Sequence, residues 1–318
     1  MSEIWTIGEI LVEIMRPRPG MQLFEPGEFL GPFPSKAPAI FIDAAARLGH
    51  SAGIIGGVGE DDFGRCVVER LEAHGVCTDL IRRVPGQSTA VAFVTYFQDG
   101  TRRFIFHIAG TPAVSHDASA INRIVDCRLL HVMGCSLMPD ARFRDAILEA
   151  ITRLHARGAR ISFDPNIRPE LLGTRDISEL VAPILNRCSL LLPGRQELAL
   201  LSGREAPEEG VKALFDWTPI EIIALKNGRT GCTLYSRTET INIPAFEVAE
   251  VDPTGAGDCF DAGFVCGLLE GRGLRECGII AAAAGALNAG AFGPMEGDLT
   301  RSTVDRLIET RSQAKRVQ

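Results

Sequence analysis

The hydrophobic pattern of the chain predicts buried strands that alternate with helices. Ala52–Val58 is almost continuously apolar, which is typical of a strand covered on both faces, and the helix expected from about Asp62 stops before Gly75. Further strands, each with a helix beside it, are expected at Leu129–Met133, Ala159–Phe163, Ser189–Leu192 and Glu221–Leu225. This alternation predicts an α/β fold in which helices cover both faces of a mostly parallel sheet. We also expect Ile4–Ile14 to form a single strand at the start of the chain.

Two stretches interrupt this alternation. Residues 15–34 are rich in Gly and Pro, and residues 86–110 contain two strand-like runs separated by Asp99-Gly100, which is a good hairpin signal. We expect these stretches to form a small accessory β-sheet, discontinuous in sequence, within one unit that spans residues 1–318. Cys232–Tyr235 and Thr240–Ile243 predict a second hairpin.

Composition narrows the class of protein. The chain is 46% hydrophobic with a net charge of −7, and it has no basic run, so a nucleic-acid partner has no electrostatic support. The nine cysteines are odd in number and include no Cys-x-x-Cys pair, which argues against a disulfide framework and against a zinc site. No leader is visible at the N-terminus, and the weakly polar run Cys277–Pro294 is interrupted by Asn288. We therefore expect a soluble, cytoplasmic protein with no membrane partner.

The segment Asp252–Asp258, with the sequence DPTGAGD, is the strongest candidate for chemistry. It precedes a proline-free apolar run typical of a buried helix, so Gly255 and Gly257 would expose backbone N–H groups at a helix N-terminus, where anions bind. Asp258 would lie in the first turn and could accept a proton from a substrate hydroxyl. Taken alone, the segment could also be an ordinary helix cap with a first-turn carboxylate, and Asp261 is a rival base.

The run from Asp252 to Phe260 resembles the C-terminal signature of the ribokinase-like (PfkB) family of sugar and nucleoside kinases, and the resemblance spans essentially the whole chain. It implies a ribokinase-like fold in which the accessory sheet is a lid over the sugar. It also implies transfer of a phosphoryl group from ATP, with Mg²⁺, to a sugar hydroxyl. In this interpretation Asp258 is the general base, and Gly255, Ala256 and Gly257 form the anion hole.

The resemblance assigns further residues to the rim of the sheet, where ligands of a parallel sheet gather. The residues assigned to ATP are Lys226, Gly228, Gly231 and Asn288. The residues assigned to the sugar are Glu13 and Arg168, with Lys36 and Arg103 as further candidates. Structural alternatives remain: Lys226 could snorkel to solvent from a strand end, and Asn288 could bond locally. Arg168 could instead pair with Asp164 inside its own loop.

The chain departs from the family pattern in two segments. Ser35–Ile40 stands where the family has Gly-Gly-x-Pro-Ala-Asn, so the sugar-binding Asn is absent, and Lys36 could either reach into the pocket or be solvated. Gly194–Glu197 stands where the family has Asn-x-x-Glu, a motif linked to magnesium and phosphate. Glu197 is therefore a candidate metal ligand that lacks its Asn partner.

The acceptor is expected to be a neutral ketohexose phosphorylated on its terminal hydroxyl. Kinases of 2-keto-3-deoxygluconate in this family often hold the acid with Tyr-x-Arg on the lid, and Phe106–Ile108 offers neither residue at that place. Pro32–Asp43 resembles tagatose kinases in particular. A kinase of 2-keto-3-deoxygluconate remains an alternative, because Lys36 and the pair Arg102-Arg103 could hold a carboxylate.

Other classes fit the sequence less well. A nicotinamide dehydrogenase would need a third glycine after Gly56–Gly59, and the acidic run Glu60–Asp62 would repel a pyrophosphate. A P-loop kinase is excluded because the chain has no Gly-Lys dipeptide. A catalytically inactive sugar-binding or regulatory relative stays open because Ser35–Ile40 is altered. Exposed strand edges on the lid also predict a homodimer through the lid.

Overall fold

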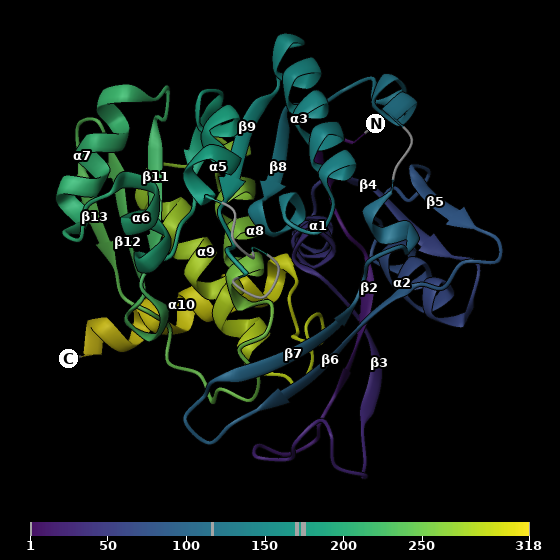
Figure 1. The fold of residues 1–318 in the computed structure, drawn as a ribbon. Helices are drawn as coiled ribbons and strands as arrows, with labels where there is room; N and C mark the ends of the chain where they lie inside the picture. The colour runs from purple at the N-terminus through teal and green to yellow at the C-terminus, as the bar shows by residue number, and fades with distance from the viewer. Residues whose placement is uncertain (1, 116–117, 169–171, 173–175, 318) are drawn as a thin grey trace.

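The computed structural model describes residues 2–115, 118–168, 172 and 176–317. Within these residues, nine strands form a central sheet in the order β13-β12-β11-β10-β9-β8-β1-β4-β5 (Figure 1). The strands are β1 (Ile4–Ile7), β4 (Ala52–Gly59), β5 (Ile81–Val84), β8 (Leu129–Met133), β9 (Arg160–Asp164), β10 (Cys188–Leu191), β11 (Ile222–Lys226), β12 (Cys232–Ser236) and β13 (Thr240–Ile243). All neighbours are parallel except for β12, which runs antiparallel to both β11 and β13. The mostly parallel sheet and the second hairpin are confirmed.

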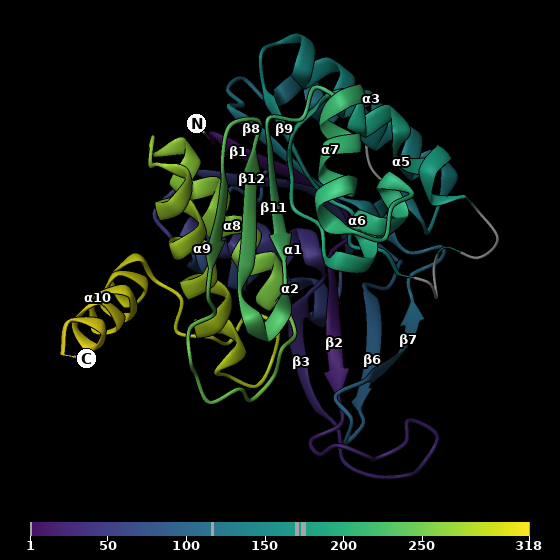
Figure 2. The ribbon, with the colours of Figure 1, turned by 90° about the vertical axis from the view of Figure 1, so that its left-hand side faces the viewer.

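Helices cover both faces of this sheet, as predicted. One face packs against α1 (Ala37–Arg47), α2 (Asp62–Ala73), α8 (Ala256–Leu269), α9 (Leu274–Ala289) and α10 (Arg301–Val317). The other face packs against α3 (Ala141–Ala156), α5 (Ile177–Leu185), α6 (Arg195–Ser202) and α7 (Pro207–Trp217). Figure 2 shows these helices on the right and α8, α9 and α10 on the left. Successive strand residues divide between the two cores, since Leu129 belongs to the first and Leu130 to the second. The shorter 3₁₀ helices are Pro112–Val114, Ala118–Arg123, Gly134–Leu137 and Gly228–Thr230.

A separate small sheet lies below the central one in Figure 1, in the strand order β3-β2-β6-β7. Its strands are β2 (Leu11–Met15), β3 (Leu30–Ser35), β6 (Ala90–Tyr96) and β7 (Arg102–His107). Strand β2 is parallel to β6, and the other two pairings are antiparallel. We call this sheet the lid. Because its strands come from distant parts of the sequence, its position depends on how the chain crosses from one sheet to the other.

The prediction of a single strand over Ile4–Ile14 is wrong. The chain leaves the central sheet after Ile7 and enters the lid at Leu11. Gly8 lies at this crossing, where an added Cβ would be 2.2 Å from Cγ of Pro38 at the start of α1. The apolar pattern is continuous because both strands are buried, so periodicity alone does not reveal the break.

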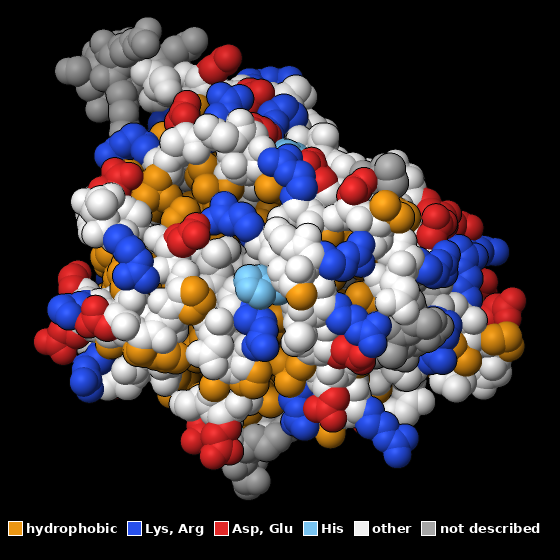
Figure 3. Space-filling view, turned by 90° about the horizontal axis from the view of Figure 1, so that it is seen from above, with side chains coloured by type: hydrophobic (Ala, Val, Ile, Leu, Met, Phe, Trp, Pro, Cys, Tyr) orange, Lys and Arg blue, Asp and Glu red, His pale blue; other side chains and the backbone are white. Residues whose placement is uncertain are grey.

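The surface charges and the state of the cysteines can be compared with what the composition predicts. On the face seen in Figure 3, acidic and basic side chains are interspersed rather than gathered by sign. All nine cysteines are free thiols. Among the described helices, none combines the length and the apolar character needed to cross a lipid bilayer.

Close packing of α8 against α9 fixes the helix that carries the DPTGAGD motif. Gly263 of α8 faces α9, where an added Cβ would lie 2.9 Å from Cα of Ala281 and 3.1 Å from the carbonyl oxygen of Ile280. Both neighbours are backbone atoms of a helix, so neither can move aside alone. Glycine is therefore required here by the approach of the two helices.

We predict that Gly263→Ala lowers the free energy of unfolding by about 1–3 kcal/mol, because overpacking exceeds the gain of up to about 1 kcal/mol in helix propensity. Denaturant unfolding measures this change. Gly210→Ala in α7 is the matched control, since an added Cβ there meets side chains, the nearest atom being Oγ of Ser202 at 2.7 Å. Equal stability of Gly263→Ala and the wild type would contradict the packing argument.

Candidate active site

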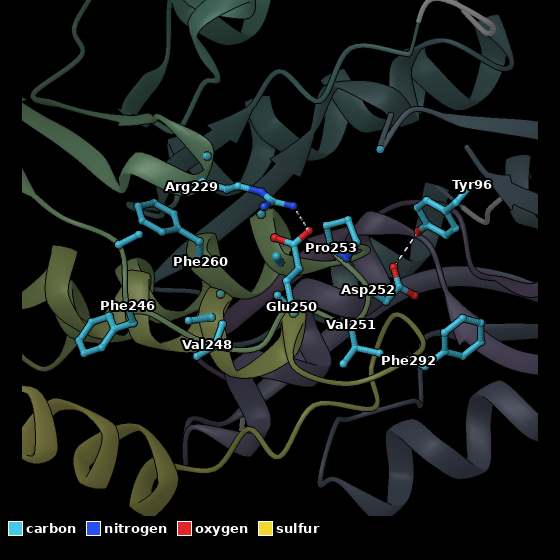
Figure 4. Close-up of a pocket in the computed structure, with 18 of the residues that line it drawn as sticks. Tyr96, Arg229, Phe246, Val248, Glu250, Val251, Asp252, Pro253, Phe260 and Phe292 are labelled. Atoms are coloured by element: carbon cyan, nitrogen blue, oxygen red, sulfur yellow. Dashed lines mark hydrogen bonds and ion pairs between the residues drawn. The ribbon is translucent and has the colours of Figure 1, made fainter. Parts of the chain in front are cut away.

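Two cavities meet at the N-terminus of α8. The larger has a volume of about 1560 Å³ and lies between the loop 228–231, the segment 244–253 and α9 (Figure 4). The smaller, about 210 Å³, lies under the lid and reaches Asp258. Lys226, Pro253 and Gly257 line both cavities. A group held at Gly257 can therefore be reached from either side.

The turn at Gly255 shapes this meeting point. Gly255 has φ 77°, and an added Cβ would lie 2.5 Å from the carbonyl oxygen of Pro294, so only glycine fits. Gly257 is open by comparison, since the nearest atom to an added Cβ is Nζ of Lys226 at 3.9 Å. The amide of Ala256 donates to the carbonyl of Pro253 at 3.3 Å. The first-turn amides that follow have no acceptor within the helix, and the helix dipole favours an anion beside them.

Asp258 is buried at the end of the smaller cavity. Its Oδ1 accepts a hydrogen bond of 3.3 Å from Nδ2 of Asn166, a residue with φ 40° in the loop after β9. Burial, and next the negative charge of Asp164, raise the pKa of Asp258 to about 6. Lys226 and Arg168 oppose this shift. The carboxylate is thus mostly ionised near neutral pH and close enough to its pKa to accept a proton.

Asp261 has a different environment from Asp258. It lies one turn further along α8, is fully buried, and pairs with Nζ of Lys226 at 3.1 Å. It lines neither of the two cavities. The geometry therefore favours Asp258 over Asp261 as the carboxylate that a bound substrate can reach.

Lys226, at the end of β11, is held between two carboxylates. Its Nζ lies 2.9 Å from Oδ2 of Asp164 and 3.1 Å from both carboxylate oxygens of Asp261. These charges outweigh the effect of burial and raise the pKa of Lys226, so the ammonium group stays charged. Lys226 does not snorkel to solvent, and it brings positive charge to the point where the cavities meet. Its role toward a nucleotide phosphate stays a prediction.

Of the other residues assigned to ATP, two line the larger cavity and one does not. Gly228 and Gly231 line the larger cavity. Asn288 does not: it is fully buried and donates from Nδ2 to the carbonyl of Thr254 at 2.8 Å. The face of α9 that lines the cavity consists of Ala282, Gly285, Ala286 and Ala289. Asn288 lies beside that helical stripe, where it holds the loop that precedes Gly255.

Of the four residues assigned to the sugar, three line the smaller cavity. Glu13, Lys36 and Arg168 line the smaller cavity, whereas Arg103 does not. Side chains alternate along β7, so Arg102, Phe104 and Phe106 face the cavity and Arg103 is exposed beside Phe97. The sequence could have identified Arg102 as a cavity residue, because in a strand Arg102 lies on the same face as Phe104 and Phe106. Asn166 is a site residue that the sequence analysis missed, because its contact with Asp258 joins two loops that are far apart in the chain.

Glu13 and Lys36 are both buried, but Glu13 is bound by a neutral hydroxyl and Lys36 by a carboxylate. Oε1 of Glu13 accepts from the Ser35 hydroxyl at 2.7 Å, and burial raises the pKa of Glu13 to about 7. Nζ of Lys36 lies 3.4 Å from Oε1 of Glu9 and 5.1 Å from the ring centre of Phe106. Despite burial, the Glu9 carboxylate raises the pKa of Lys36. Lys36 thus reaches into the pocket, already paired with an acid.

Glu197 lines the smaller cavity, but both of its carboxylate oxygens already accept hydrogen bonds from backbone amides. Its Oε1 accepts from the amide of Ile167 at 2.8 Å, and its Oε2 accepts from the amide of Gly194 at 2.7 Å. The side chain therefore joins the start of α6 to the loop after β9. Across the described ranges, no group of three or more His, Cys, Asp or Glu side chains could hold a metal ion. Magnesium fits this site as a companion of bound phosphates, with few protein ligands.

We predict that Lys226→Met lowers the free energy of unfolding by about 3–5 kcal/mol, because it leaves buried carboxylates unpaired. Denaturant unfolding should show a smaller loss at about pH 5 than at about pH 8. In the variant, burial without the lysine charge should raise the pKa values of these acids in the folded state, so protonation would relieve them as the pH falls. Lys212→Met is the control: its exposed pair with Asp216 is worth less than about 1 kcal/mol. Equal effects of the two changes would contradict the buried pairing.

Comparison with known proteins identifies the family. Residues 41–301 match the pfkB family of carbohydrate kinases. A putative ribokinase II from E. coli, in complex with ATP and Mg²⁺, has a TM-score of 0.91 and 38% identity, covering 98% of this chain and 100% of that chain. Fructokinase-1 of Zea mays is 31% identical over 259 residues, 80% of this chain and 79% of the relative. Probable fructokinase-4 of Arabidopsis thaliana is 28% identical over 318 residues, 97% of each. The chain belongs to the pfkB family and is an ATP-dependent carbohydrate kinase with a ribokinase-like fold.

Proposed function

We propose that this kinase transfers the γ-phosphoryl group of ATP to the terminal hydroxyl of a ketohexose, with Asp258 as the general base. One observation carries the proposal: the buried carboxylate of Asp258 faces the cavity under the lid, directly beside Gly257, which also lines the larger cavity. An acceptor hydroxyl in the smaller cavity and a phosphate in the larger one would then be neighbours across the first turn of α8.

The chain's own groups support each part of this reaction. Nucleotide would occupy the larger cavity, with Gly228, Gly231 and the small residues of α9 around it. Bound ATP with Mg²⁺ supplies the phosphoryl group and neutralises part of its charge. Amides of Gly255 and Gly257 would stabilise the negative charge that develops on the phosphoryl oxygens, and the amide of Ala256 would join them on release from the carbonyl of Pro253. Asp258 would accept the proton of the attacking hydroxyl, and the lid would exclude water.

A ketohexose is favoured as acceptor by the relatives and by the cavity. The two plant relatives reported above are fructokinases by name, and a fructokinase from Vibrio cholerae has been solved with fructose and ADP. Oε2 of Glu13, which has no hydrogen-bond partner among the described residues, could accept a hydrogen bond from a sugar hydroxyl. Tagatose is our named substrate, on the resemblance of Pro32–Asp43 to tagatose kinases.

A keto acid such as 2-keto-3-deoxygluconate is the second candidate, favoured by the charge of the smaller cavity. Arg102 and Arg168 both line it, and neither forms an ion pair within the described part of the chain. An unpaired guanidinium in a small cavity suits a substrate carboxylate. Lys36 is a weaker candidate for that contact because Glu9 already compensates its charge.

Assembly and location belong to the same proposal. A homodimer through the lid would cover β7, whose outer face exposes Arg103, Ile105 and His107. A cytoplasmic location would supply ATP and would keep the nine thiols reduced.

Sugar-dependent release of ADP from MgATP tests the reaction, with tagatose, fructose, ribose and 2-keto-3-deoxygluconate as acceptors. We expect a ketohexose, tagatose first, to be used best, and Asp258→Asn to lower kcat by at least about 100-fold because the base is lost. Nucleotide titration and thermal unfolding of the variant control for loss of binding or folding. Preference for the keto acid would establish the second candidate, and full activity of Asp258→Asn would refute the role of the base.

The pH profile gives a separate test of Asp258. We expect kcat/KM for the sugar to fall about tenfold per pH unit below the pKa of about 6, since the carboxylate must be ionised to accept a proton. Glu13, with a pKa of about 7, is the other acid that could shape this limb. In Glu13→Gln the limb near pH 6 should remain. If the fall in kcat/KM disappeared in that variant, Glu13 rather than Asp258 would be the group that causes it.

A further inference from the structure

Tyr96 links the lid to the loop that precedes the anion hole. It is the last residue of β6, and its hydroxyl donates a hydrogen bond of 2.7 Å to Oδ1 of Asp252 (Figure 4). The same hydroxyl is hydrogen bonded to Oγ1 of Thr254. Asp252 and Thr254 lie immediately before Gly255 in the DPTGAGD motif. A lid side chain is thus built into the framework of the phosphate-binding turn.

The other bonds of this loop are made within the loop itself and with the main body of the protein. Oδ1 of Asp252 accepts from the amide of Thr254 at 2.9 Å, and Oδ2 accepts from the amide of Gly293 at 3.0 Å. The carbonyl of Thr254 accepts from Asn288. Asp252 is only 1% exposed although it borders the larger cavity, so the loss of one donor should leave its carboxylate poorly compensated. The Tyr96 hydroxyl is therefore a structural partner of the loop rather than a surface contact.

Tyr96 is itself fixed within the lid. Its carbonyl accepts from the amide of Gly20 at 2.7 Å, and the neighbouring Thr95 hydroxyl donates to the carbonyl of Met21 at 2.5 Å. Burial and the nearby Asp252 charge raise the pKa of Tyr96 far above its usual value, so the phenol remains a neutral donor. Any shift of the lid strands would carry the hydroxyl away from Asp252.

We infer that Tyr96 is a positioning residue that couples the seating of the lid over the sugar to the geometry of the anion hole. When the lid is seated, the hydroxyl completes the bonds that hold Asp252 and Thr254, and the amides after Gly255 are set for the phosphoryl group. When the lid lifts, the loop loses that bond and the amides are less well ordered. The inference rests on the proposed function, because it assigns those amides to phosphate.

A double-mutant cycle tests the coupling through catalysis. Tyr96→Phe keeps the ring and removes the hydroxyl, and Thr254→Val removes one of its partners. We expect each change to lower kcat by about tenfold, with KM for MgATP changed less than about threefold, and the double variant to fall no further than the lower single variant. Tyr235→Phe is the matched control: Tyr235 is the other tyrosine of the chain, is buried in β12, and should leave kcat unchanged.

Hydrogen exchange tests the contact without relying on turnover. We expect Tyr96→Phe to speed exchange in peptides covering residues 252–258 while the central strands keep wild-type rates. A kcat within about twofold of wild type, multiplicative losses in the cycle, or faster exchange throughout the chain would each overturn the inference. A wild type without sugar-dependent ADP release would instead refute the proposed function. Exchange at 252–258 would still decide whether Tyr96 orders the loop.

Discussion

The left-handed turn at Gly255 is the constraint on which the site depends. It can be occupied only by glycine, because Pro294 stands where a Cβ would be, and it aims the first turn of α8 at the place where the two cavities meet. Asn288 holds the turn from α9, Tyr96 holds it from the lid, and Gly263 lets α8 lie against α9. Elements far apart in sequence thus converge on one short loop.

Charge is distributed around this loop in two separate arrangements. Lys226 is surrounded by Asp164 and Asp261, which fix its charge and remove Asp261 from the cavities. Within the described residues, the carboxylate of Asp258 accepts one side-chain hydrogen bond, from the neutral amide of Asn166, and its pKa of about 6 lies close to neutral pH. The same sequence segment therefore contains a structural acid and an accessible acid three residues apart. Their environments, rather than their residue type, separate the two roles.

The sequence predicted the α/β fold and the kinase family because both depend on local patterns: strand and helix periodicity, and the contiguous DPTGAGD motif. Features that depend on packing were predicted less well. The break between β1 and β2 is hidden because both strands are buried, and Asn288 is turned away from the cavity by the helical position it occupies. Arg102 rather than Arg103 faces the cavity, a choice that strand alternation could have settled once the inner face of β7 was known.

The measurement that tests the account most directly is a crystal structure with MgADP, a planar phosphoryl mimic and the preferred sugar. The account predicts the mimic against the amides of Gly255–Gly257, with the acceptor oxygen about 2.6–3.2 Å from a carboxylate oxygen of Asp258. An acceptor oxygen held by another group, or a mimic away from the first turn of α8, would contradict it.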